Sequence, residues 1–164
     1  MDETWVHHYM PETKKQLKQW VEAGGSVPKK AKSITSIWKV MASMFRDAKG
    51  IPLIDYLEKG TTITDEYYSN LLDQQDVKIC EKRPGLKKKK IIFPQDNTPT
   101  HKRLLAMGKL QDLRYNLLSH PPNSPDLTPS DFHLFPNLKK LVSGKCFASN
   151  EEVERTVDEY FNSL

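Results

Sequence analysis

The sequence predicts a mixed α/β fold, with one sheet covered by helices. Three stretches rich in β-branched and aromatic residues come first, at residues 4–9, 40–45 and 51–57. Helical and strand patterns then alternate up to about residue 118, and two helical patterns follow. Consecutive antiparallel strands followed by alternating helices and strands describe a mixed sheet with helices against its faces.

Turn signals set the order of the predicted strands. The residues Asp47-Ala48-Lys49-Gly50 separate the second and third stretches and predict a hairpin. Before this hairpin, the glycines and proline within residues 22–37 predict a long irregular loop. Two shorter strands are expected at 91–93 and 115–118, which makes a sheet of five strands.

Each predicted helix begins at a capping signal. Thr64 precedes two acids and apolar residues at helical spacing, and Asn150 precedes the last helix. Thr98 and Thr128 are each followed by a proline, which is favoured at the first helical position. We expect Pro136 to kink the helix that Thr128 opens. The apolar residues at helical spacing after Thr98 and Thr128 are Leu104, Leu105, Leu110, Leu113, Phe132, Phe135, Leu138, Leu141 and Val142.

Composition excludes several classes of protein. With 164 residues, of which 37% are hydrophobic and 28% charged, the chain suits a single globular domain over residues 1–164. No apolar run approaches the roughly 20 residues that span a bilayer, which excludes an integral membrane protein. No signal peptide is expected, so Cys80 and Cys146 are expected to be reduced thiols.

Positive charge is concentrated in one stretch of the chain. The formal net charge is +4, and Lys87, Lys88, Lys89 and Lys90 form an unbroken run. Such a run is typical of a solvated loop. The alternative interpretation is a nucleic-acid-binding patch, in which these lysines contact phosphates in a salt-dependent way.

Three aspartates stand where a metal site could form. Asp2 begins the first strand, Asp96 follows the fourth, and Asp131 lies in the first turn of a helix. Neighbouring strands of a mixed sheet could bring the first two together, while the helix supplies the third. Hard divalent cations prefer carboxylate oxygens, and two ions roughly 3.5–4 Å apart can activate water for attack on a phosphodiester.

Each of these acids has a structural alternative. Thr128 and Asp131 fit a helix capping box, Asp96 fits a polar turn, and Asp2 fits a frayed terminus. Rival carboxylates that spacing does not dismiss are Asp47, Asp55, Asp65, Asp112 and Asp126. A histidine zinc site is disfavoured, because adjacent histidines on a strand point to opposite faces and no histidine pair has an i, i+4 spacing.

Several motifs resemble those of mariner transposases, in the same order. Three of them are Asp2-Glu3-Thr4-Trp5-Val6, Lys39-Val40-Met41-Ala42-Ser43 and Gln95-Asp96-Asn97, and the longest is HPPNSPDLTPSD at residues 120–131. The 34 residues between Asp96 and Asp131 match the spacing of the family's second and third catalytic acids. The resemblance runs along nearly the whole chain, from Asp2 to about Phe161.

The resemblance implies a ribonuclease H-like core with a five-stranded mixed sheet flanked by helices. In it, Asp2, Asp96 and Asp131 would be the catalytic residues and the ligands of two Mg²⁺ or Mn²⁺ ions, for DNA hydrolysis and strand transfer. The loop at residues 22–37 resembles one that clamps a partner subunit, which implies a homodimer on DNA. A nuclear location and a role in DNA integration and recombination are also implied.

Departures from the family pattern define an alternative function. The family usually has an aromatic residue at Arg46, Tyr at Asn123 and His at Pro94, where the proline removes a backbone N–H two residues before Asp96. We also expect the N-terminal DNA-binding domains to be absent, and the first strand and C-terminal segment to be truncated. The alternative is therefore an inactive or domesticated remnant that binds nucleic acid or dimerises.

Overall fold

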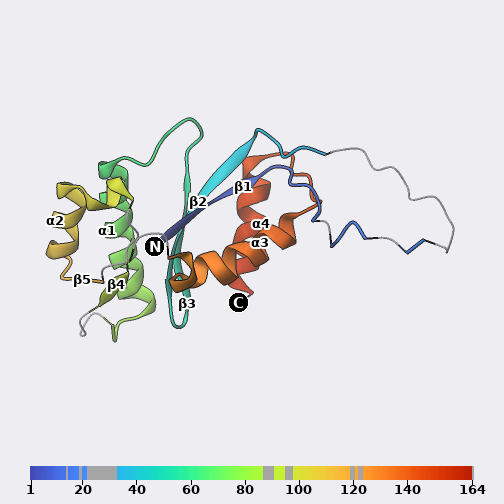
Figure 1. The fold of residues 1–164 in the computed structure, drawn as a ribbon. Coiled ribbons are helices and arrows are strands. Elements are labelled where there is room, and N and C mark those ends of the chain that lie inside the picture. Colours follow the sequence, from blue (N-terminus) through green and yellow to red (C-terminus); the bar gives the residue numbers. More distant parts are fainter. Residues whose placement is uncertain are drawn as a thin grey trace.

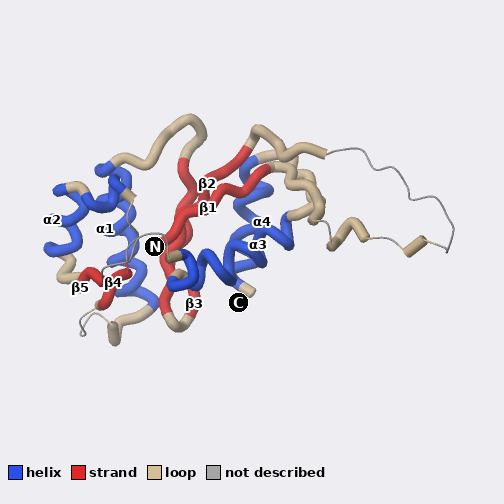
Figure 2. The backbone as a smooth tube through the Cα atoms, viewed as in Figure 1, coloured by secondary structure: helices blue, strands red, loops and turns tan. Residues whose placement is uncertain are grey.

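A computed structural model describes residues 1–13, 15–18, 20–21, 33–86, 91–94, 98–118, 121 and 124–163 (Figure 1, Figure 2). Within these residues the strands are β1 (Asp2–His7), β2 (Lys39–Asp47), β3 (Gly50–Leu57), β4 (Ile92–Pro94) and β5 (Asn116–Leu118). The helices are α1 (Asp65–Lys82), η1 (Pro99–Lys102), α2 (Leu104–Asp112), η2 (Pro125–Leu127), η3 (Ser130–Leu134), α3 (Phe135–Val142) and α4 (Asn150–Asn162). None of the helices described here is long and apolar enough to cross a membrane.

The strands β1, β2 and β3 form an antiparallel sheet in that spatial order. The predicted hairpin between β2 and β3 is confirmed. Its turn is closed by the Lys49 N–H, which donates to Asp47 Oδ1 at 2.7 Å. Gly50 ends the turn at a φ of 125°, a conformation that a side chain would disfavour.

The predicted single sheet of five strands is not confirmed. The described residues form the three-stranded sheet and a separate parallel pair of β4 and β5. The strand β4 has only three residues and ends at Pro94, which has no N–H to donate to a further ladder. The mixed α/β class is nevertheless as expected, with parallel and antiparallel pairs and helices on both sides.

Both faces of the three-stranded sheet are covered by other elements. Successive residues of β2 point in opposite directions, so its buried residues belong to two apolar clusters. Val40 and Met44 face η3, α3 and α4, whereas Phe45 faces α1, α2 and the β4–β5 pair. Figure 1 shows α3 and α4 on one side of the sheet and α1 and α2 on the other. The apolar cluster on the α3–α4 side consists of Val6, Val40, Met44, Leu134, Phe135, Leu138, Val142, Val153, Val157 and Phe161.

Two helix caps were predicted with different success. The Thr64 hydroxyl accepts the Tyr67 N–H at 3.2 Å and caps α1 as expected. The cap of α4 is Ser149 and not Asn150, since the Ser149 hydroxyl accepts the Glu152 N–H at 3.3 Å. Asn150 is used elsewhere, because its Oδ1 lies 2.8 Å from His8 Nε2.

The helix expected after Thr98 is divided in two. The 3₁₀ helix η1 ends before Arg103, whose extended backbone (φ −69°, ψ 156°) separates it from α2. Thr98 makes no side-chain capping bond to η1, so that expectation was wrong. The break also changes which residues are buried, and Leu104 is 93% exposed while Leu110 is buried.

The expected kink near Pro136 takes the form of a change of helix type. The π-helix η3 passes into α3 at Phe135, and Pro136 lies in the first turn of α3. Proline has no N–H to donate and disturbs the α-helical bonding pattern. The wider π turn also alters the phase of the helix, so Phe132, expected at helical spacing with the core residues, is exposed.

Two tyrosine hydroxyls tie β3 to helices on opposite faces of the sheet. Tyr56 donates to Asp158 Oδ1 of α4 at 2.6 Å, and Tyr67 of α1 donates to Asp55 Oδ2 of β3. Burial, followed by the hydrogen bond to Asp55, raises the pKa of Tyr67 well above its ordinary value. Tyr67 is therefore a protonated donor throughout the neutral pH range.

Truncation of the core should cost far more stability than the same change on the exposed side of the same helix. We expect Leu138→Ala, at a fully buried position, to lower the free energy of unfolding by about 2–5 kcal/mol. Leu141→Ala is the matched control, because Leu141 is 39% exposed on α3. Urea unfolding monitored by circular dichroism measures both, and equal losses would contradict the packing described here.

The Tyr67–Asp55 bond should make stability depend on alkaline pH. Because the folded pKa of Tyr67 is raised above its ordinary value of 10.0, its contribution is complete below about pH 10 and declines as the pH rises further. We expect Tyr67→Phe to cost about 1.5–3 kcal/mol at pH 8 and visibly less at pH 11. Urea unfolding at both pH values tests this, with Tyr9→Phe as control. A cost that does not change with pH would contradict it.

Candidate functional site

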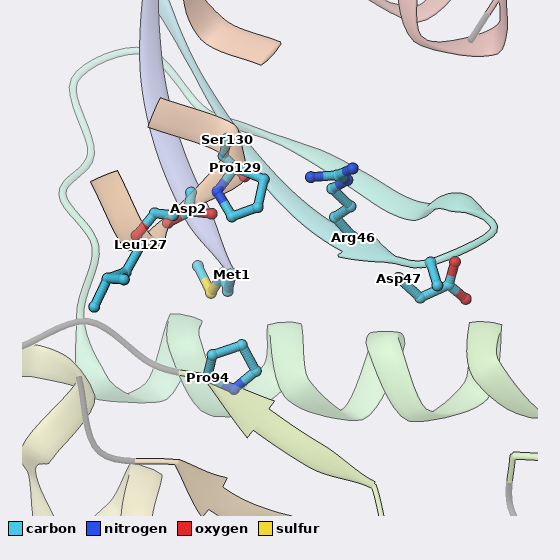
Figure 3. A pocket seen from close by; sticks show the side chains of 10 residues that line it. Met1, Asp2, Arg46, Asp47, Pro94, Leu127, Pro129 and Ser130 are labelled. Carbon is cyan, nitrogen blue, oxygen red and sulfur yellow. The ribbon is translucent and has the colours of Figure 1, made fainter. Parts of the chain in front are cut away.

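A cavity of about 380 Å³ lies where four segments of the chain meet (Figure 3). Its walls are the start of β1 with Met1 and Asp2, the turn side of the β2–β3 hairpin with Arg46, the end of β4 with Pro94, and residues 127–130. In Figure 3, Asp2 lies beside the segment 127–130, and Met1 points toward Pro94. The cavity therefore joins parts of the chain that are far apart in sequence.

The first predicted acid, Asp2, lines this cavity and is half-buried. In the antiparallel register it lies opposite Met44, whose side chain belongs to the core on the α3–α4 side. Residues two apart on a strand share a face, so Asp2 points to the same side as Val6. Asp2 is the first residue of β1 and is paired with Met44 of β2. The expectation that Asp2 lies at a frayed terminus was therefore wrong.

The third predicted acid, Asp131, directly follows the cavity segment 127–130. It is exposed in the first turn of η3, and its N–H donates to the Thr128 carbonyl at 2.9 Å. The expected side-chain cap from Thr128 is not formed, since the residue that precedes η3 is Pro129 and no side-chain capping bond is made there. The helix is instead started by the backbone carbonyl of Thr128.

The second predicted acid, Asp96, lies outside the described residues, as do Lys87–Lys90, Asn123 and residues 22–32 of the expected clamp loop. Pro94 is two residues before Asp96 and lines the cavity. Among the described residues no group of three or more His, Cys, Asp or Glu side chains could hold a metal ion. One cavity is thus lined by Asp2, by Pro94, which is two residues before Asp96, and by Ser130, which directly precedes Asp131.

Three rival aspartates have structural partners. Asp55 accepts from Tyr67, Asp65 pairs with Arg103 at 3.1 Å, and Asp47 pairs with Arg83 at 2.9 Å. The Asp47–Arg83 pair joins the β2–β3 hairpin to the end of α1. These contacts show that the three carboxylates hold elements together, and Asp47 also lines the cavity.

The imidazoles on β1 and just after it also have structural roles. His7 Nδ1 lies 2.8 Å from the Ser36 carbonyl, and His8 Nε2 lies 2.8 Å from Asn150 Oδ1. The two rings bind different partners on different segments, as expected for adjacent strand residues. Among the described residues neither Cys80 nor Cys146 forms a disulfide, and the Cys80 thiol donates to Asp76 Oδ2 at 3.8 Å.

Sequence reasoning missed a buried polar pair on the other face of β1. His101 Nε2 lies 3.3 Å from Glu3 Oε1, and the His101 ring stacks on Tyr68 with the ring centroids 4.2 Å apart. His101 is only 1% exposed. The alternation of side chains along β1 predicts that Glu3 and Asp2 lie on opposite faces of the sheet. No pattern in the sequence predicts that Glu3 contacts His101.

Comparison with known proteins identifies relatives that span the whole chain. A family model described as "Transposase (partial DDE domain)" matches residues 10–89. The Mariner Mos1 transposase of Drosophila mauritiana is 30% identical over 162 residues, which cover 98% of this chain and 46% of that protein. Histone-lysine N-methyltransferase SETMAR of Homo sapiens is 30% identical over 163 residues, which cover 99% of this chain and 23% of that protein.

Solved structures agree with these relatives in three dimensions. The Mos1 mariner paired-end complex with Mn superposes with a TM-score of 0.89 at 30% identity, over 99% of this chain and 47% of that chain. The Mos1 transposase catalytic domain with Raltegravir and Mg gives a TM-score of 0.73 at 31% identity, over 77% of this chain and 64% of that chain. The likeness supports an α/β fold of the ribonuclease H-like type. The chain spans about half the length of the curated mariner transposase it matches, and it belongs to the mariner family of DDE transposases.

Proposed function

We propose that this chain is the catalytic core of a mariner transposase, which cuts DNA phosphodiester bonds and transfers strands. In this proposal Asp2, Asp96 and Asp131 are the catalytic residues and hold two Mg²⁺ or Mn²⁺ ions. The observation that carries it is the cavity. Asp2 lines it, Pro94 brings the chain to within two residues of Asp96, and the lining segment 127–130 leads directly into Asp131.

The donors available at this cavity suit hard divalent cations. Asp2 in the cavity wall and Asp131, directly after the lining residue Ser130, offer carboxylate oxygens, the ligands that Mg²⁺ and Mn²⁺ prefer. Both residues are accessible to solvent, so a DNA phosphate could approach them. When bound, two such ions activate a water or hydroxyl nucleophile and stabilise the leaving oxygen. Structures of Mos1 with Mg and with Mn support this choice of metal.

The position of Asp131 in a π-helix is a further support. Single π turns inside helices occur frequently at functional sites, because they change the direction of side chains. The turn that carries Asp131 is fixed on its buried side by Ser130 and Leu134, which are 2% and 4% exposed. A rigid backbone behind an accessible carboxylate keeps that carboxylate in place for binding.

A phosphate contact near these acids is supplied by Arg46. This residue is exposed, and its side chain forms part of the cavity wall formed by β2. A guanidinium offers a planar set of donors that matches phosphate oxygens. We therefore include Arg46 among the residues that bind the DNA backbone, together with Lys87, Lys88, Lys89 and Lys90.

The remaining parts of the proposal concern assembly and extent. Mos1 relatives are seen in paired-end complexes, one of them with the left transposon end, which supports DNA as the partner. The proposal includes a homodimer formed through residues 22–37. The β1–β2–β3 sheet and the β4–β5 pair would together form the five-stranded mixed sheet of a ribonuclease H-like core. Residues 1–164 would form a single catalytic unit, and its place of action would be the nucleus.

Neutralising any one acid of the trio should abolish cleavage. We expect Asp2→Asn, Asp96→Asn and Asp131→Asn each to reduce Mn²⁺-dependent nicking of supercoiled plasmid DNA by at least about a hundredfold, because each removes a ligand charge. Asp112→Asn is the matched control, an exposed aspartate at the end of α2. Calorimetric titration with Mn²⁺ should show binding by the wild type and the control only.

Wild-type activity in any of the three variants would remove that residue from the site. A wild-type protein that binds DNA but neither Mn²⁺ nor Mg²⁺ would favour the inactive remnant that binds nucleic acid or dimerises.

Removing the Arg46 charge should weaken DNA binding in a salt-dependent way. We expect Arg46→Gln to lower affinity for duplex DNA several-fold and to reduce the slope of log affinity against log salt by about 1, because one phosphate contact is lost. Fluorescence anisotropy between low and moderate salt measures this. Arg114→Gln, at an exposed arginine after α2, is the control. An unchanged slope would exclude a direct phosphate contact.

A further inference from the structure

A buried polar contact joins β1 to η1 on the face of the sheet that points away from α3. Glu3 Oε1 lies 3.3 Å from His101 Nε2, with 18% of the Glu3 side chain and 1% of the His101 side chain exposed. Tyr68 of α1 stacks on the His101 ring at an interplanar angle of 25°. The contact is therefore enclosed by the sheet, by α1 and by η1.

Stability alone gives little reason to bury a carboxylate against an imidazole at this place. Removing polar or charged groups from water costs free energy, and apolar residues of similar volume are often as stabilising as a buried polar pair. What such a pair does supply is a fixed distance and orientation between two elements, provided that both side chains are held. Stacking on Tyr68 holds the His101 ring, and pairing of β1 with β2 fixes the Glu3 backbone opposite Ser43.

The two elements that are joined each lie next to a predicted metal ligand. Glu3 directly follows Asp2, and η1 begins at Pro99, three residues after Asp96. In the described residues β1 and β4 share no ladder hydrogen bonds. The Glu3–His101 contact, a close approach of a carboxylate oxygen and a ring nitrogen, thus connects the segment that carries Asp2 with the segment that follows Asp96. Apolar packing of Met1 in the cluster that contains Phe93 acts in the same direction.

We propose that Glu3 and His101 are positioning residues, which set the separation of Asp2 and Asp96 so that both carboxylates can bind the same pair of ions. The inference rests on the proposed function. It assigns no contact with DNA or metal to Glu3 or His101. Their effect passes through the backbone of β1 on one side and through the chain from Asp96 to η1 on the other.

The test compares two carboxylate-to-amide changes, each at a contact in which a carboxylate of one element meets a nitrogen of another. Glu3→Gln keeps the size of the side chain and removes its charge. Asp73→Asn does the same to the pair in which Lys109 Nζ lies 2.7 Å from Asp73 Oδ2, which joins α2 to α1 away from the cavity. We expect Glu3→Gln to weaken Mn²⁺ binding about tenfold or more by calorimetry, as loss of supporting partners does at metal sites. Asp73→Asn should keep wild-type affinity.

Steady-state nicking separates positioning from general destabilisation. Glu3→Gln should lower kcat with little change in KM for DNA, measured well below the melting temperature of the variant. His101→Gln should behave like Glu3→Gln, and the double variant should be no worse than either single variant, because all three remove the same link. Independent, multiplying losses in the double variant would overturn the inference.

A readout without metal or activity completes the test. Deuterium exchange of the metal-free protein should rise in Glu3→Gln both at residues 1–8 and at residues 92–102, whereas Asp73→Asn should leave both segments unchanged. Asp2→Asn distinguishes the two proposals. If it abolishes Mn²⁺ binding while Glu3→Gln binds Mn²⁺ and exchanges like the wild type, the positioning role fails and the function stands. If Asp2→Asn binds Mn²⁺ like the wild type, the proposed function fails and the positioning role fails with it.

Discussion

The structure depends on the alternation of side chains along β1 within a sheet that is buried on both faces. The pairing of β1 with β2 fixes Asp2 opposite Met44 and Glu3 opposite Ser43. Successive residues point in opposite directions, so this register directs the two acids to opposite sides. A slip of one residue would exchange them, burying Asp2 against α1 and sending Glu3 to the cavity. Core packing of Val6 against the α3–α4 cluster opposes such a slip.

Each face of the sheet then contributes a different part of the site. On one side, η3 and α3 pack on the sheet, and the cavity that Asp2 lines is also lined by Ser130, the first residue of η3, which directly precedes Asp131. On the other side, α1, η1 and the β4–β5 pair place His101 next to Glu3, and Pro94 at the cavity wall toward which Met1 points. The cavity is located where the two layers meet at the end of the sheet. Changes in either layer should therefore alter the site, although few of the residues concerned touch the cavity.

Much of the fold could be predicted because local signals agreed with the tertiary structure. The β2–β3 hairpin and α1 have strong turn and capping residues, and both form close to where they were expected. Prediction failed where a non-local contact decided the result. Asn150 has good capping chemistry, yet it bonds to His8 from the other end of the chain. Prediction also failed where the helix type changes locally, because Phe132 has helical spacing and the π-helix that contains it leaves it exposed.

The candidate site shows the same division. Asp2 and Asp131 could be proposed from motif order and spacing, and the cavity brings their segments together. The pairing of Glu3 with His101 could not be predicted, because it depends on how β1 packs against a 3₁₀ turn almost a hundred residues away. The sequence indicated Arg46 only as a departure from a family pattern. Its position in the cavity wall makes it a candidate for contact with a DNA phosphate.

The most direct measurement is a crystal structure of the protein soaked in Mn²⁺, with anomalous diffraction used to locate the metal. Two peaks roughly 3.5–4 Å apart are predicted in the cavity, each contacted by carboxylate oxygens at about 2.0–2.2 Å, with Asp2, Asp96 and Asp131 as the protein ligands. Peaks at a distance from Asp2, or a cavity without any peak at saturating Mn²⁺, would contradict the proposal that these three aspartates form one metal site.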